Sequence, residues 1–170
     1  MCSARECGKK YPGYSEADRR LPYAKYFSGR TSTPQPVIDE ALARGPLRPH
    51  HVPPLSAMAK EFAAPGYSPV ETGYGRLDNG RVWVATLTDM PGVRPEMWDW
   101  WFGWHSDASA KYKLWHPDAH RFAAIKRAFP ADAPLTDRQR YIGNVSYIDE
   151  YIGDHEAQAQ IAFVDPSEFG

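Results

Sequence analysis

Tryptophan is concentrated in one short stretch of this chain: five of the six tryptophans lie between Trp98 and Trp115. Pro95 and Glu96 predict a helix start there, because proline suits the first helical position and a carboxylate suits the positive end of the helix dipole. The bulky side chains that follow recur at the spacing of one helical face: Met97, Trp100, Trp101 and Trp104. Such a helix needs a large apolar partner surface. We expect three of these side chains in the core: Met97, Trp101 and Trp104.

The charge and hydropathy of the chain are typical of a globular protein. Its 170 residues suffice for one compact core with a small appendage. Charged residues make up 24% and hydrophobic residues 42%, and the mean hydropathy is -0.59. Lys and Arg number 20 against 21 Asp and Glu, so the net charge is -1. Without a summed positive field, we expect no nucleic acid partner.

The amino terminus and the cysteines indicate the setting of the protein. Residues 1–10 lack the apolar run of a secretory signal, and no apolar stretch in the chain is long enough to cross a bilayer. The two cysteines, Cys2 and Cys7, form no four-ligand zinc pattern. We therefore expect a cytoplasmic protein in a reducing setting, with no membrane partner.

Proline, arginine, alanine and serine are frequent in the first third of the chain, which predicts an arm or small lobe over residues 1–65. Within it, Pro36 to Arg44 is a predicted helix that ends at Gly45. The pattern changes afterwards, and we expect residues 66–170 to form the main domain.

The second part of the chain alternates strand and helix patterns, which indicates an α+β fold. Strands at Ser68 to Leu77 and Arg81 to Met90 are predicted to form a hairpin with a buried face, because Asn79-Gly80 suits a tight turn. Four further elements are expected: a strand at Lys111 to Trp115, a helix at Ala119 to Phe129 with Phe122, Ile125 and Phe129 inward, and strands at Tyr141 to Ile152 and Ala157 to Val164.

Three of the six histidines, His105, His116 and His120, lie beside the tryptophans. Imidazoles next to a helix rich in indoles suit either a large core plug or one wall of an aromatic ligand pocket beside a metal or an acid–base group. Residue types alone favour core packing, and both interpretations stay open.

Glu150 is the carboxylate most relevant to such a pocket. On a strand, its side chain points the same way as Ile148 and Ile152. If that face is buried, the carboxylate needs a cation, a metal or a proton beside it. An exposed Glu150 is equally compatible with the pattern.

Four segments carry distinctive motifs of aromatic, histidine and acidic residues: Glu71 to Gly75, Met97 to His105, Tyr112 to His120 and Tyr147 to Gly153. Together they resemble the 2,4-diacetylphloroglucinol hydrolase family, which is related to phloretin hydrolase. The resemblance implies a partial helix-grip domain of the Bet v 1 or START kind, preceded by a small irregular and helical lobe.

The resemblance also implies an activity. Family members are zinc-dependent enzymes that hydrolyse the carbon–carbon bond between an acyl group and a polyhydroxylated aromatic ring. The expected substrate is a small aromatic molecule like 2,4-diacetylphloroglucinol or phloretin, and a homodimer is a candidate assembly.

The family motif assigns candidate roles to individual residues. The family holds zinc with two histidines and two glutamates, and His120 and Glu150 match two of these ligands. Tyr112 matches a tyrosine that contacts substrate, and His105 is a second candidate for a catalytic, proton-handling role. Three tryptophans are candidates to stack on the substrate ring: Trp98, Trp100 and Trp115.

One part of the family pattern is missing. The family's later His-x-x-x-Glu pair has no match, since no histidine in this sequence has a glutamate four positions after it. We therefore expect the natural fold to continue past Gly170. The alternative is a non-catalytic module that binds aromatic ligands by shape.

Overall fold

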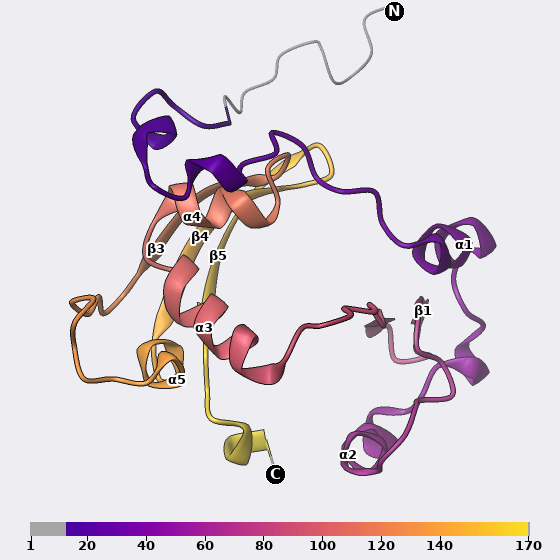
Figure 1. The fold of residues 1–170 in the computed structure, drawn as a ribbon. Helices are drawn as coiled ribbons and strands as arrows, with labels where there is room; N and C mark the ends of the chain where they lie inside the picture. Colours follow the sequence, from indigo (N-terminus) through magenta and orange to yellow (C-terminus); the bar gives the residue numbers. More distant parts are fainter. Residues whose placement is uncertain (1–12, 170) are drawn as a thin grey trace, which may run out of the picture. The chain divides into compact units, whose positions relative to one another are not determined.

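A computed structural model describes residues 13–169, apart from four side chains, those of Leu55, Ala59, Phe62 and Phe169. Cys2 and Cys7 lie outside the described residues. The described part is an α+β fold with two antiparallel sheets (Figure 1). This confirms the predicted fold class, whereas the helix-grip arrangement stays a prediction.

Contacts divide the chain into two compact units. In the described range, unit 1 comprises residues 13–31 and 93–169, and unit 2 comprises residues 32–92. The expected division into an arm or small lobe over residues 1–65 and a main domain over residues 66–170 stays a prediction.

Unit 2 contains α1 (Pro36–Arg44), α2 (Leu55–Ala63) and the hairpin of β1 (Gly73–Arg76) and β2 (Val82–Ala85). Helix α1 has the predicted bounds, with proline in its first turn and Gly45 at φ 80° after its last residue.

The predicted hairpin in unit 2 is confirmed with shorter strands, and Gly80 adopts the positive φ that its turn needs. One face of the hairpin is buried, as expected: Gly73 and Gly75 are buried, and Val52 lies against Gly75. The opposite face is open, since Val82 and Val84 are 71% and 68% exposed.

Unit 1 is built on a three-stranded antiparallel sheet in the order β3 (His120–Ile125), β4 (Val145–Ile152) and β5 (His155–Ala162). The last two strands were predicted, with a turn at Gly153. Ala123 and Ile148 pair across β3 and β4 and are buried together with Tyr112.

Three α-helices of unit 1 accompany this sheet: α3 (Pro95–His105), α4 (Ser109–Trp115) and α5 (Asp137–Tyr141). Helix α4 packs on β3 and α5 packs on α3 (Figure 1). The α3–α5 approach needs Gly103, because a Cβ there would lie 2.7 Å from the Asp137 carbonyl oxygen. The start of α3 at Pro95 is as predicted, but Met97 is 38% exposed, so its expected core position is wrong.

Two neighbouring predictions are wrong in type. Lys111 to Trp115 is helical within α4, and the expected helix from Ala119 is strand β3. Pairing of β3 with β4 overrides the helical spacing of Phe122, Ile125 and Phe129, and Phe122 is 44% exposed instead of inward.

Strand β3 contains a bulge at Arg121. Phe122 pairs with Asp149, but His120 pairs with Glu150, so two residues of β3 oppose one position of β4. The bulge therefore sets His120 directly opposite Glu150.

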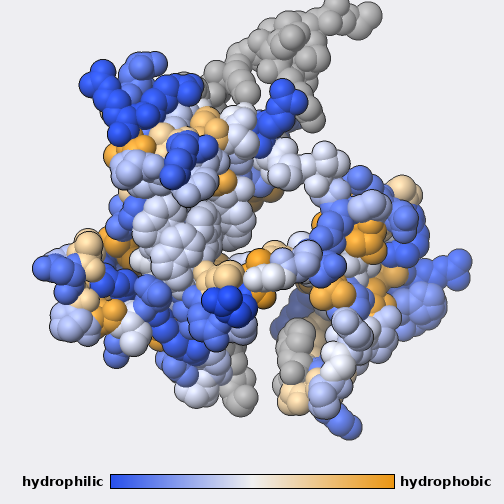
Figure 2. Space-filling model, in the orientation of Figure 1, coloured by the Kyte–Doolittle hydropathy of each residue, from blue (hydrophilic) through white to orange (hydrophobic). Residues whose placement is uncertain are grey.

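The surface of the described residues is mixed. On the face drawn in Figure 2, hydrophobic residues form small separate patches among hydrophilic ones. Within residues 13–169, none of the helices combines the length and the apolar character required to span a bilayer.

Candidate functional site

Four aromatic rings of unit 1 stack in a column. Trp101 and His105 come from α3, Tyr112 from α4 and His120 from β3. Successive ring centroids are 4.9, 6.0 and 3.6 Å apart, with interplanar angles of 19°, 16° and 3°. The column brings three of the predicted site residues together from three different elements.

Trp115 stands edge-on to this column. Its ring centroid lies 5.5 Å from that of His105, 6.4 Å from that of Tyr112 and 5.4 Å from that of His120. The indole is 48% exposed, so one side remains accessible.

The other two candidate tryptophans stack elsewhere on α3. Trp98 lies on Phe102 at 5.8 Å and Trp100 on Trp104 at 5.3 Å. Trp100 also touches the end of the ring column, with its ring centroid 6.1 Å from that of Trp101, whereas Trp115 contacts the other three rings.

Glu150, on strand β4, contacts the Tyr112 and His120 end of the column. The Tyr112 hydroxyl donates a hydrogen bond of 2.8 Å to Glu150 Oε2, and His120 Nε2 lies 3.4 Å from the same oxygen. The His120 side chain is 10% exposed and that of Glu150 is 23% exposed. The face that carries Glu150 is buried at Ile148 and open at Ile152, which is 65% exposed.

The hydrogen bonds of His120 define its tautomer. Nδ1 lies 3.0 Å from the Tyr112 carbonyl oxygen, which can only accept, so Nδ1 carries the proton. Burial lowers the pKa of His120 to about 4, so the ring is neutral at pH 7. Nε2 therefore presents a lone pair to a carboxylate oxygen, an arrangement that calls for a cation between them.

The other two titratable groups of the column are also held neutral at pH 7. Burial lowers the pKa of His105, whose Nδ1 lies 2.7 Å from the Trp101 carbonyl oxygen. Burial, reinforced by the Glu150 carboxylate, raises the pKa of Tyr112 far above its usual value. Tyr112 therefore keeps its proton as a donor.

Among residues 13–169, no three His, Cys, Asp or Glu side chains converge as a metal site, so His120 and Glu150 form a pair of potential ligands only. Trp101 was predicted only as a core residue, and its place in the ring column was not predicted. Its i, i+4 spacing from His105 was the available signal.

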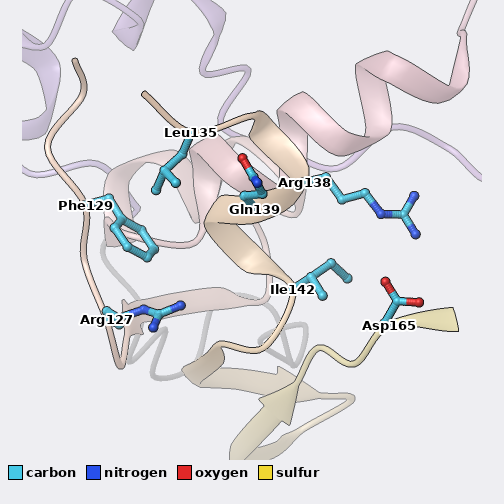
Figure 3. Close-up of a pocket in the computed structure, with 7 residues that line it drawn as sticks. All are labelled: Arg127, Phe129, Leu135, Arg138, Gln139, Ile142 and Asp165. Carbon is cyan, nitrogen blue, oxygen red and sulfur yellow. The ribbon is translucent and has the colours of Figure 1, made fainter. Parts of the chain in front are cut away.

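A hollow of about 470 Å³ lies at the other end of β3, between Phe129, α5 and Asp165. Figure 3 shows Arg138 and Asp165 reaching toward each other on one side, with Phe129 and Leu135 on the other. None of the predicted site residues lines this hollow, so the ring column is a separate feature.

Comparison with known proteins agrees with the resemblance noted in the sequence. The family model described as DAPG hydrolase PhiG domain matches residues 54–170, which is more than half of the chain. The chain belongs to this DAPG hydrolase family. The match includes all of the ring column and Glu150, and it begins after residues 13–31.

Relatives of this DAPG hydrolase family member carry informative names. The chain is 34% identical over 164 residues to phloretin hydrolase of Eubacterium ramulus, covering 93% of this chain and 58% of the relative. It is 30% identical over 156 residues to the 2,4-diacetylphloroglucinol hydrolase of Pseudomonas protegens, covering 91% of this chain and 50% of the relative. The chain thus spans about half the length of the curated relatives it matches.

Proposed function

We propose that this chain carries one half of the active site of a hydrolase that cleaves the carbon–carbon bond between an acyl group and a polyhydroxylated aromatic ring. The observation that carries the proposal is the meeting of His120, Tyr112 and Glu150 beside an edge-on indole. The names of the relatives support the substrate class, a phloretin-like or diacetylphloroglucinol-like molecule.

His120 and Glu150 suit two of the ligands of a zinc ion. Zinc binds imidazole nitrogen and carboxylate oxygen at about 2.0–2.2 Å, so two such ligands of a tetrahedral ion lie about 3.3–3.5 Å apart. The His120 Nε2 to Glu150 Oε2 distance is 3.4 Å, longer than an ordinary hydrogen bond. The Tyr112 carbonyl holds the imidazole in the tautomer that a metal requires.

A bound zinc ion would supply Lewis-acid polarisation of the acyl carbonyl and lower the pKa of a bound water. The chain's own groups would orient the substrate and handle its protons. Trp115 offers its exposed face to the phenolic ring, and the Tyr112 hydroxyl holds a proton 2.8 Å from Glu150.

The proposed overall reaction consumes one water: its hydroxyl joins the acyl carbon, the carbon–carbon bond breaks, and the ring carbon takes a proton. Tyr112 is our candidate donor of that proton, and the remaining proton of the water then restores the Tyr112 hydroxyl. His105 stacks on Tyr112, and we assign it a supporting role in the proton transfer from Tyr112. Ring hydroxyl groups make the departing ring carbanion stable enough to leave, since they permit a ketone tautomer.

Zinc titration by calorimetry tests the ligand pair. We expect His120→Ala and Glu150→Gln each to weaken zinc binding at least about tenfold, whereas the exposed His50→Ala leaves it unchanged. Equal affinity in all four proteins would refute the metal site.

Incubation with 2,4-diacetylphloroglucinol or phloretin tests the reaction. We expect zinc-dependent release of the carboxylic acid, lost with a chelator and with Tyr112→Phe. Binding of the phenol that ignores the chelator, with no acid released under any metal, would instead indicate the non-catalytic module.

A further inference from the structure

Residues 13–31 precede the segment matched by the family, yet they belong to the same compact unit as the ring column. They contain two short 3-10 helices, Asp18–Arg20 and Ala24–Tyr26. We call residues 13–31 the clasp. In Figure 1 the clasp is the indigo segment that runs past α4.

The first end of the clasp is fixed to α4, the helix that carries Tyr112. The Tyr14 hydroxyl donates a 2.5 Å hydrogen bond to the Ala110 carbonyl oxygen, and Lys113 Nζ donates one of 3.0 Å to the Gly13 carbonyl oxygen. Tyr14 is only 4% exposed and stacks on Phe27 at 3.9 Å. Such a contact is a buried anchor and not a loose surface association.

The second end of the clasp holds the turn that leads into β3. The Thr31 backbone N–H donates a 2.7 Å hydrogen bond to Asp118 Oδ2, and Thr31 Oγ1 lies 3.1 Å from His116 Nδ1. One residue thus binds both ends of the His116 to Asp118 turn, although it lies about 85 positions away in the sequence.

This turn determines where His120 begins its strand. The His120 backbone N–H donates to the His116 carbonyl oxygen at 2.9 Å, and the two imidazole centroids are 5.5 Å apart. A turn held at both ends therefore restricts the backbone of His120, in addition to its pairing with β4.

We propose that Thr31 is a positioning residue for His120: the clasp fixes the preceding turn so that the imidazole stays stacked on Tyr112 and aimed at Glu150. The effect on metal affinity rests on the proposed function, whereas the effect on the His120 ring does not. A shortened protein that contains only residues 54–170, the segment matched by the family model, would lack Thr31 and therefore its bonds to the turn.

Four substitutions test the proposal in the full chain. Thr31→Val removes the hydroxyl and keeps the backbone bond to Asp118, whereas Thr31→Ser keeps both. Thr33→Val, at an exposed threonine two residues further on, is the matched control. Tyr14→Phe loosens the other end of the clasp independently of Thr31.

Histidine-ring NMR of the metal-free chain gives the primary measurement, namely the exchange rate of the His120 Nδ1 proton that is donated to Tyr112. We expect Thr31→Val to raise this rate about fivefold, as for loss of one hydrogen bond, with Tyr14→Phe changing it in the same direction. Thr31→Ser and Thr33→Val should match the parent chain. Unchanged exchange in Thr31→Val would overturn the proposal, whatever the result for Tyr14→Phe.

Zinc affinity, measured by competition with a coloured chelator, distinguishes an effect of Thr31 on the metal site from an effect on the His120 ring alone. Binding about fivefold weaker in Thr31→Val, restored in Thr31→Ser, supports a positioning role toward the metal ligand. If the parent chain binds no zinc, the metal site of the proposed function fails, while the exchange rates still decide the role of Thr31.

Discussion

The two units of the molecule differ in what they bury. Unit 1 buries His105 and His120, each with Nδ1 at a backbone carbonyl oxygen, whereas the buried side chains described in unit 2 are those of Ala41 and Val52. Both units contain helices beside an antiparallel sheet, yet the hairpin of unit 2 leaves Val82 and Val84 open. The two units thus have similar secondary structure, but among the described residues the buried polar side chains all lie in unit 1.

The comparison first predicts a difference in acid stability. The His120 pKa is about 4 in the folded state and about 6.5 when unfolded, so the unfolded chain takes up a proton that the folded one excludes. The stability of unit 1 is therefore complete above pH 6.5 and falls as the pH drops, by about 3 kcal/mol at pH 4.

Urea unfolding of chelator-treated protein at pH 7 and pH 4 measures this loss. Tryptophan fluorescence reports mainly on unit 1, which holds five of the six tryptophans. His120→Phe, which keeps a flat ring against Tyr112, should remove most of the dependence. An equal loss in that variant would assign the acid sensitivity to other groups.

The second prediction compares two tightly packed glycines. A Cβ at Gly103 would lie 2.7 Å from a backbone oxygen of α5, whereas a Cβ at Gly75 in unit 2 would meet the Val52 side chain at 2.5 Å. A backbone atom moves less easily than a side chain. We expect Gly103→Ala to cost about 2 kcal/mol and Gly75→Ala about 1 kcal/mol in thermal or urea unfolding. The reverse order would contradict the close α3–α5 packing.

The third prediction concerns two tyrosines. The Tyr141 hydroxyl donates a 2.5 Å hydrogen bond to Asp99 Oδ1. The pKa of Tyr141 is raised to about 12, mainly by burial. Tyr141→Phe should lower the free energy of unfolding by about 1 kcal/mol. Tyr67→Phe in unit 2, at a side chain that is 84% exposed, should change nothing measurable.

The smallest effect is expected on the open face of the hairpin. Val84→Thr should change the free energy of unfolding by no more than about 0.5 kcal/mol, because the side chain is 68% exposed and threonine also favours strands. A loss above about 1 kcal/mol would mean that this face is covered in solution, and the contrast between the units would weaken.

Local signals predicted part of this fold well. Proline at the start of α1 and α3, Gly45 after α1 and the Asn79-Gly80 turn act through backbone geometry within a few residues. Helix α5 was not predicted, although the capping box of Thr136 and Gln139 is a local signal for its start.

The elements around the site were harder to predict. Strand β3 is determined by its pairing with β4, and helix α4 by its packing on β3. The residue spacing within each segment therefore predicted the wrong type of secondary structure. The approach of His120 to Glu150 was expected from the family motif, supported by the strand pattern around Glu150. The contact of Thr31 with His116 has no local signal, because its partners meet only in the folded chain.

The bulge at Arg121 decides which side chain Glu150 faces. In an uninterrupted β3–β4 register Arg121 would stand opposite Glu150, and a guanidinium, charged at every physiological pH, would neutralise the carboxylate permanently. Instead Arg121 pairs with Glu156 at 3.1 Å on the outer side, and an uncharged imidazole takes the inner place. Because of this one extra residue, the Glu150 carboxylate is not paired with an arginine, and its negative charge remains available to a bound cation.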